Sequence, residues 1–367
     1  MNATKIGSIE AIFFVLIVIT NKIILNIPKT IISSCGTSAW INVIFISIFA
    51  ILFTLLIVKL FKRFESYDIF DISKYLGGNF LKNLCAIGYL FIFILVSAIM
   101  LRDFSENLKL IYYSKSPLIF IMLFFIIGAV IGNKLGFKAI VKTNLLIMPI
   151  VIISILVILL ASLKNMVPQR LLPILGNGIN KTFISGFSNI FSYSGLTYLF
   201  LLMPYLKDSK KFKKISIISI IISSIYLFLS VICLLLASPY ITVTNEPMSL
   251  YILTRSLEFG KFFQRTDALF ILLFIMSCLS YLTISLLLIL NIFKKMTNIE
   301  DSKAMCYCFA TLILGLALIP NNIAQEQTIQ YEIFKYFILY FVFGFSTIIL
   351  IFANRKKKKD LENNSQL

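Results

Sequence analysis

The sequence predicts an all-helical integral membrane protein with ten transmembrane helices. Of its 367 residues, 59% are hydrophobic and only 14% are charged, whereas about a quarter of an average soluble domain is charged. Apolar runs of the length that crosses a bilayer, about 20 residues, recur along the whole chain. Lys and Arg are divided unequally between alternate connections of these runs. Most of the surface is therefore expected to face lipid.

The ten runs define the predicted spans in chain order. They lie at about residues 8–26, 38–61, 83–104, 116–132, 138–162, 184–205, 215–237, 266–293, 304–320 and 330–353. The fourth and ninth are the shortest and cross the bilayer only if their ends extend further. The first run continues into Asn26-Ile27-Pro28 without a small-residue cleavage pattern, so it is expected to be a retained span rather than a signal peptide.

Charge sidedness predicts the orientation of these spans. With the N-terminus inside, the inner connections and termini carry 22 Lys and Arg, the outer connections carry 11, and Lys22 lies within the first span. Cytoplasmic connections are the ones enriched in Lys and Arg. Both termini are therefore predicted to be cytoplasmic. One transmembrane domain is expected over residues 1–353, with halves at about 1–162 and 184–353, followed by a polybasic cytoplasmic tail over 354–367 that anchors at anionic headgroups.

Composition also excludes several classes of function. The chain has no histidine, which removes the commonest general base and metal ligand. Its six cysteines form no CxxC pair and are interpreted as small apolar packing residues, so no metal or other cofactor is expected. The net charge of +18 is a topology signal and does not indicate nucleic acid, because a nucleic-acid binder needs its basic residues on one soluble face.

Polar residues interrupt two of the spans, the first of each five-helix half. In transporters with inverted five-helix repeats, the first helix of each half is broken and its freed backbone binds substrate at the bilayer midplane. The alternative is that Ser and Thr bond to their own helix and Tyr packs as a core residue. The density of polar residues favours a ligand cavity, with candidates Thr20 and Asn21 in the first span and Asn189, Ser192, Tyr193, Ser194, Gly195 and Tyr198 in the sixth.

Three further polar residues near the middle of spans three and eight, Ser97, Ser277 and Tyr281, are candidates for the same cavity or for helix packing. Lys22 could reach a carboxylate, replace a coupling sodium ion or extend to the outer surface, and we favour the last. Arg102-Asp103 and Arg265-Thr266-Asp267, at span edges, are interpreted as structural ion pairs.

Several landmarks resemble those of a known family, the permease-like B subunits of spore germination receptors, in the amino acid-polyamine-organocation superfamily. They are Ile27-Pro28-Lys29 and Gly36-Thr37-Ser38-Ala39-Trp40 after the first span, Leu171 to Gly178 before the sixth, and Phe263 to Phe270 at the eighth. The superfamily's first break is usually glycine-rich, whereas here it reads Thr20-Asn21-Lys22.

The resemblance implies a 5+5 inverted-repeat transporter fold with broken helices 1 and 6. It further implies a germinant receptor subunit in the spore inner membrane that binds a small polar germinant, in that family often an amino acid, and triggers germination with an A-type membrane subunit and a C-type lipoprotein. The alternative is an ion-coupled secondary amino-acid transporter. An enzyme is not expected, because the long outer connections contain few acids and no histidine.

Overall fold

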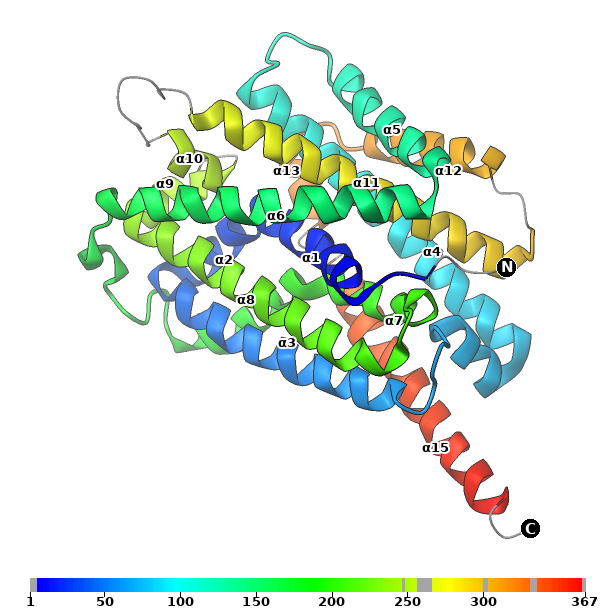
Figure 1. Cartoon of the computed structure of the whole chain (residues 1–367). Helices are drawn as coiled ribbons and strands as arrows, with labels where there is room; N and C mark the ends of the chain where they lie inside the picture. Colours follow the sequence, from blue (N-terminus) through cyan, green and yellow to red (C-terminus); the bar gives the residue numbers. More distant parts are fainter. Residues whose placement is uncertain (1–4, 246–247, 256–265, 300–302, 331–334, 365–367) are drawn as a thin grey trace.

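The structure is a computed structural model that describes residues 5–245, 248–255, 266–299, 303–330 and 335–364. It is a bundle of helices, several of them broken (Figure 1). Within the described residues, β-type pairing is limited to one bridge between Ile6 and Leu206. The helices are α1 (Ser8–Ile24), α2 (Ile27–Cys35), η1 (Gly36–Ser38), α3 (Ala39–Phe61), α4 (Ile69–Ile111), α5 (Leu118–Leu135), α6 (Phe137–Ala161), η2 (Ser162–Asn165), η3 (Pro168–Leu171), η4 (Asn180–Ile184), η5 (Ser185–Tyr198), α7 (Leu199–Leu202), η6 (Met203–Tyr205), η7 (Ser209–Lys211), α8 (Phe212–Ala237), α9 (Tyr240–Asn245), α10 (Ser249–Arg255), α11 (Thr266–Thr297), α12 (Lys303–Ala317), α13 (Ile323–Thr328), α14 (Lys335–Ile338), η9 (Leu339–Phe345) and α15 (Ser346–Asn364).

Seven helices of the described chain are long and apolar enough to cross a membrane. They correspond to the second, third, fourth, fifth, seventh, eighth and tenth predicted runs. The other three runs are helical but shorter or interrupted: α1 has 17 residues, α12 has 15, and the sixth run changes helix type along its length. The chain is therefore a multi-pass membrane protein.

Local sequence explains where the longest helix begins and bends. Asp68 accepts hydrogen bonds from the backbone N–H groups of Phe70 and Asp71 and so caps α4. Gly77 and Gly78 then interrupt the helical backbone, and Gly78 has φ of 69°, which favours glycine. The kink separates a short amphipathic start from the membrane-crossing part of α4.

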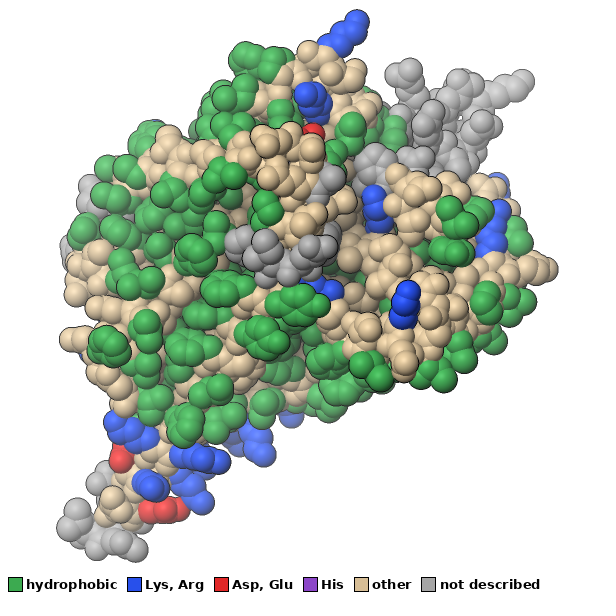
Figure 2. All heavy atoms as spheres, turned by 180° about the vertical axis from the view of Figure 1, so that it is seen from behind, with side chains coloured by type: hydrophobic (Ala, Val, Ile, Leu, Met, Phe, Trp, Pro, Cys, Tyr) green, Lys and Arg blue, Asp and Glu red, His purple; other side chains and the backbone are tan. Residues whose placement is uncertain are grey.

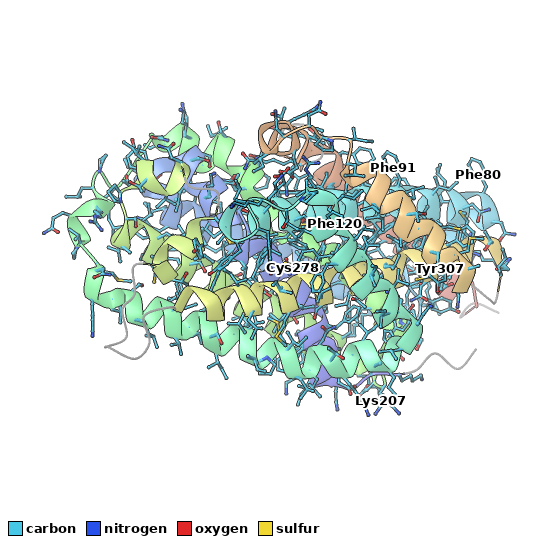
Figure 3. All side chains as sticks on the ribbon, turned by 90° about the horizontal axis from the view of Figure 1, so that it is seen from above. Phe80, Phe91, Phe120, Lys207, Cys278 and Tyr307 are labelled. Atoms are coloured by element: carbon cyan, nitrogen blue, oxygen red, sulfur yellow. The ribbon has the colours of Figure 1, made fainter. Side chains whose placement is uncertain are left out.

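Helix α11 lies at the centre of the bundle and α5 at its edge. In the most apolar stretch of each helix, 78% of residues in α11 are buried, against 33% in α5. Phe80, Phe91, Phe120 and Tyr307, labelled in Figure 3, are large and exposed, whereas Cys278 of α11 is fully buried. Large exposed apolar side chains of this kind are expected where lipid covers the protein.

Segments that the charge pattern assigns to the inner side meet at one end of the molecule. Ile6 pairs with the chain at Tyr205, with an N to O distance of 2.7 Å. The Lys295 ammonium lies 2.5 Å from Asp68 and 2.8 Å from Asp71, which joins the end of α11 to the start of α4. Lys and Arg side chains gather at this end, from which α15 projects (Figure 2). The expected basic tail continues α15 as a helix to Asn364.

Candidate ligand site

The first span breaks, but later than predicted. The sequence suggested an interruption at Thr20-Asn21-Lys22, and the structure keeps these residues in the last turns of α1, which ends at Ile24. The Thr20 hydroxyl donates to the Leu16 carbonyl at 2.7 Å, a bond that leaves the helix intact. A new helix, α2, then starts with Pro28 in its first turn, where proline's missing N–H has no cost.

The sixth span is irregular, as its polar sequence predicts. A π-helical turn (η4) leads into fourteen residues of 3₁₀ helix (η5) and then one α-helical turn (α7). Runs of 3₁₀ helix beyond three or four residues are uncommon and often mark functional hinges. Gly195 allows η5 to approach α1 closely, because a Cβ at this position would lie 2.7 Å from the Ile19 Cγ1.

A small cavity lies where these irregular segments face α4, α11 and α14. It holds about 20 Å³ of space, roughly enough for one or two waters. Four of the eleven predicted site residues line it: Ser194, Gly195, Tyr198 and Tyr281. The other lining residues are Lys22, Ile92, Phe93, Val96, Thr197 and Ile338. The cavity is thus too small in this conformation for anything beyond one or two waters, and it has an apolar wall and a polar wall.

Lys22 is the charged group of this cavity. Its side chain is 4% exposed, its Nζ donates to the Ser194 Oγ at 2.7 Å, and Nζ lies 5.1 Å from the centre of the Phe191 ring. The prediction that Lys22 extends to the outer surface is therefore wrong, because α1 and η5 enclose the side chain. The ion pairs found in the described chain involve other cations, and no carboxylate is among the residues that line the cavity.

The remaining candidates of the first, third and eighth spans lie outside the cavity lining, and two of them join neighbouring helices. The Asn21 side-chain amide donates to the Ser277 Oγ at 2.7 Å, tying α1 to α11. Thr20 bonds within α1, as described above, and Ser97 bonds within α4, to the Phe93 carbonyl at 2.6 Å. For Thr20 and Ser97 the structure thus has the within-helix bonding that the sequence left open as an alternative.

Three candidates of the sixth span form hydrogen bonds outside the cavity lining, and two of them bond to α3. The Tyr193 hydroxyl shares a hydrogen bond of 2.7 Å with Ser47 and also bonds Ser224 at 3.1 Å. Asn189 donates to Asn42 of α3 at 3.0 Å, and the Ser192 hydroxyl bonds within η5. These contacts hold the irregular segment in place rather than lining the cavity.

None of the predicted site residues belongs to the apolar wall of the cavity, which is formed by Ile92, Phe93, Val96 and Ile338. Such residues occur throughout every span, so no sequence signal distinguishes the ones that face a cavity. Thr197 also lines the cavity and was omitted from the candidates. It belongs to the same polar cluster of the sixth span, and that cluster was the available signal.

A second polar cluster lies along the C-terminal part of α4. Asp103 accepts hydrogen bonds from the amides of Asn26 and Asn107, each at 2.8 Å. Arg102 pairs with Glu106 at 2.6 Å, so the predicted Arg102–Asp103 ion pair is wrong. The reason is that residues four positions apart lie on the same face of a helix, whereas adjacent residues do not. The other predicted pair, at residues 265–267, lies outside the described residues and side chains.

Glu326 of α13 packs near this cluster and is 1% exposed. Burial is the largest cause that raises the pKa of Glu326, to about 9; the charge of Asp103 raises it further, while Arg102 opposes the rise. At neutral pH its carboxyl group therefore holds a proton.

The overall fold is that of membrane transporters. MhsT, solved in complex with L-phenylalanine, superposes with a TM-score of 0.67 at 13% identity over 94% of this chain and 98% of its own. A Na⁺-coupled sialic acid symporter in a substrate-bound outward-open state gives a TM-score of 0.64 at 13% identity, over 95% of this chain and 79% of the symporter. At this identity the likeness concerns the fold alone.

The sequence comparisons then identify the family. Residues 5–326 match the family described as "Spore germination protein". Similar proteins of Bacillus subtilis (strain 168) are spore germination protein YndE, 23% identical over 97% of this chain and 98% of YndE, and spore germination protein KB, 23% identical over 89% of each chain. Spore germination protein B2 is 22% identical over 66% of this chain and 67% of its own. The chain belongs to the spore germination protein family.

Proposed function

We propose that this protein is the transporter-like subunit of a spore germinant receptor, and that it binds a small germinant in the cavity between α1, α4, η5, α11 and α14. The family and the transporter fold support the general assignment. The observation that carries the ligand site is the enclosed Lys22 beside the irregular segment η5.

Lys22 specifies what the ligand must supply. An ammonium buried in a membrane protein is costly unless an opposite charge or polar groups offset its lost hydration. Here the ammonium has one hydroxyl at hydrogen-bond distance and one aromatic ring, with no carboxylate in the cavity lining. A small ligand with a carboxylate would complete the site by pairing with Lys22, and its remaining atoms would contact the apolar wall of α4 and α14. This class includes amino acids and small organic acids.

The proposed architecture is ten spans in two inverted five-helix halves, with both termini cytoplasmic, in the spore inner membrane. The helix breaks in the first and sixth runs, the first of each half, support the repeat. The meeting of the basic segments at one end of the molecule supports the orientation. The partners proposed are an A-type membrane subunit and a C-type lipoprotein, which should copurify with this chain when the three are expressed together.

The small volume of the cavity suggests how binding would be coupled to a signal. A ligand larger than one or two waters needs the segments around Lys22 to separate before it enters. Ligand binding then shifts the balance of conformations by as much as its affinity differs between them. We propose that this shift, carried by η5 and α1, is what the partner subunits sense.

The test measures ligand-dependent thermal stabilisation of the purified protein. The probes are lactate and propionate, each compared with its neutral amide, and L-alanine. The acids should raise the melting temperature and the amides should not. In Lys22→Met, which keeps an unbranched apolar side chain and removes the ammonium, binding of the acids should weaken at least tenfold, or about 1.4 kcal/mol.

Ser194→Ala serves as the matched control, since it removes the hydrogen-bond partner of Lys22 and leaves the charge. It should weaken binding of the acids less than Lys22→Met does. Amides that bind as well as the acids would contradict the role of Lys22 in recognising a carboxylate, but they would still support a germinant site in this cavity. Failure of every probe to stabilise the protein would contradict the site itself.

The alternative function is an ion-coupled secondary amino-acid transporter, which the transporter fold favours. The two functions differ in what the isolated chain does. Saturable uptake of a stabilising acid into liposomes that contain this chain alone would support the transporter and count against the receptor subunit.

A further inference from the structure

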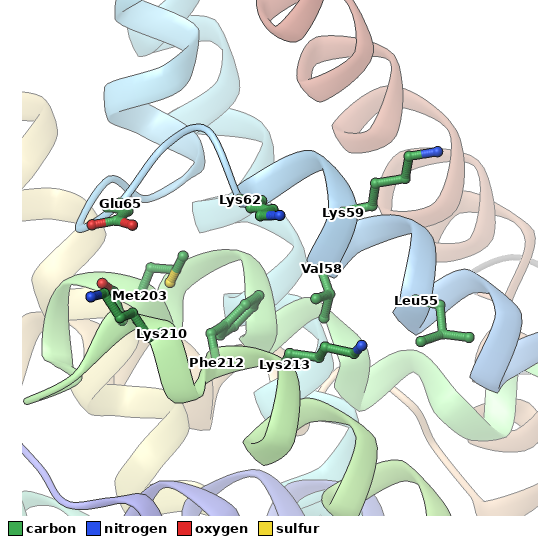
Figure 4. Close-up of a pocket in the computed structure, with 10 residues that line it drawn as sticks. Leu55, Val58, Lys59, Lys62, Glu65, Met203, Lys210, Phe212 and Lys213 are labelled. Carbon is green, nitrogen blue, oxygen red and sulfur yellow. The ribbon is translucent and has the colours of Figure 1, made fainter.

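A second hollow lies at the basic end of the molecule, outside the ligand cavity. It is open, has a volume of about 550 Å³, and lies between the end of α3 and the segment from η6 to the start of α8 (Figure 4). Leu55 and Val58 of α3 form one side of its apolar wall, and Met203 and Phe212 form the other. The hollow is therefore an apolar groove between two helices that face lipid.

Four lysines surround this groove. Lys59 and Lys62 lie three residues apart at the end of α3, and Lys210 and Lys213 lie three residues apart on the opposite side (Figure 4). None of the four belongs to an ion pair found among the described residues. Glu65 is the one acid in the lining, so the groove carries a net charge of about +3 by this count.

The groove continues into surface that lipid chains would cover. On α3, Leu52 and Leu56 are 56% and 40% exposed, and on α8 Ile221 and Ile225 are 40% and 54% exposed. These apolar residues precede the lysines in α3 and follow them in α8. The surface of both helices therefore changes from charged to apolar with increasing distance from the lysines. A molecule that fits has an anionic head and an apolar tail.

We infer that this groove binds an anionic phospholipid, with the phosphate among the four lysines and the acyl chains along α3 and α8. Lysine ammoniums bind phosphate as point charges, and their apolar stems cover the adjoining groove. Basic pockets between membrane helices are recognised sites for acidic headgroups. Scattered lysines would attract such lipids only diffusely, whereas these four line one hollow that also has an apolar wall. The lipid would hold α3 against the start of α8, the helix that also packs on α1.

The experiment compares lipid binding by two variants with equal charge changes. The groove variant carries Lys59→Gln, Lys62→Gln, Lys210→Gln and Lys213→Gln. The control variant carries Lys138→Gln, Lys142→Gln, Lys207→Gln and Lys214→Gln, four exposed lysines of the predicted inner set that do not line the groove. The delipidated full chain in detergent is titrated with phosphatidylglycerol, with phosphatidylcholine of the same acyl chains, and with inorganic phosphate, and bound lipid is counted by native mass spectrometry.

Phosphatidylglycerol should bind the wild type at least tenfold more tightly than phosphatidylcholine, and the groove variant should lose this preference while the control variant keeps it. Val58→Trp fills the apolar wall without changing charge and should also reduce binding, which keeps the test informative if the quadruple variant does not fold. Equal loss in the two quadruple variants, or full binding by Val58→Trp, would mean diffuse attraction and overturn the site. If inorganic phosphate occupies the groove with the same affinity as phosphatidylglycerol, the assignment of the ligand as a lipid would be overturned.

Discussion

Replacing Gly195 by alanine tests the close packing of η5 on α1 that forms one side of the ligand cavity. An alanine Cβ at this position would lie 2.7 Å from the Ile19 Cγ1 and 3.3 Å from the Ile19 Cα. Carbon atoms in contact are normally about 3.5–4.0 Å apart, so the two segments must separate by roughly 1 Å. The Ile19 side chain cannot relieve the contact alone, because the second contact is with its backbone.

The expected cost is about 1–3 kcal/mol of stability, the range for adding a methyl group to a packed interior. The matched control is Gly315→Ala in α12, where, apart from the glycine's own stretch of helix, nothing in the described chain lies within 4 Å of the position that a Cβ would take. That substitution should be neutral or slightly stabilising, because alanine is the better helix former.

The assay is thermal unfolding of both variants in the same detergent, together with the double variant Gly195→Ala with Ile19→Ala. With Ile19→Ala measured alone as well, the double variant should lose less stability than the sum of the two single losses, by a coupling of about 0.5–3 kcal/mol. Acid probes should also stabilise Gly195→Ala less than the wild type, because the cavity wall is displaced. If Gly195→Ala and Gly315→Ala have the same melting temperature, the close approach of η5 to α1 is refuted.

Two further predictions concern charged groups away from the cavity. Lys295→Met leaves Asp68 and Asp71 without their shared cation and should lower the free energy of unfolding by about 1–3 kcal/mol. This loss is smaller than for a fully buried pair because the Lys295 side chain is one-third exposed. Lys294→Met, measured in the same thermal assay, should cost less, and equal losses would contradict the role of the ion pair. For Glu326, the folded protein holds the proton up to about pH 9, above the usual 4.5, so stability should fall as pH rises between these values, by at most about 1.4 kcal/mol per pH unit. Melting temperatures from pH 6 to 9 should fall less steeply in Glu326→Gln, and identical slopes would show that this group does not titrate in that range.

Much of the architecture follows from local sequence. Each of the ten predicted runs coincides with helical backbone where the chain is described, since an apolar stretch in lipid must satisfy its backbone groups internally. The irregularity of the sixth span was also predictable, because Ser, Tyr and Gly are dense between residues 188 and 198. The exact end of α1 was not, because Thr20 can bond to its own helix and conceal where the helix stops.

The sequence by itself determined that this chain crosses a membrane many times, which connections are basic, and that polar residues cluster in the first and sixth spans. These properties depend on residues close together in the chain. Only the tertiary structure decided that Lys22 faces Ser194, which is 172 residues further on, and that Tyr281 lines the same cavity while Ser277 four residues earlier bonds Asn21. The physical reason is that burial, pairing and access of a polar group in lipid depend on which helices pack around it, and a single span carries no record of its neighbours.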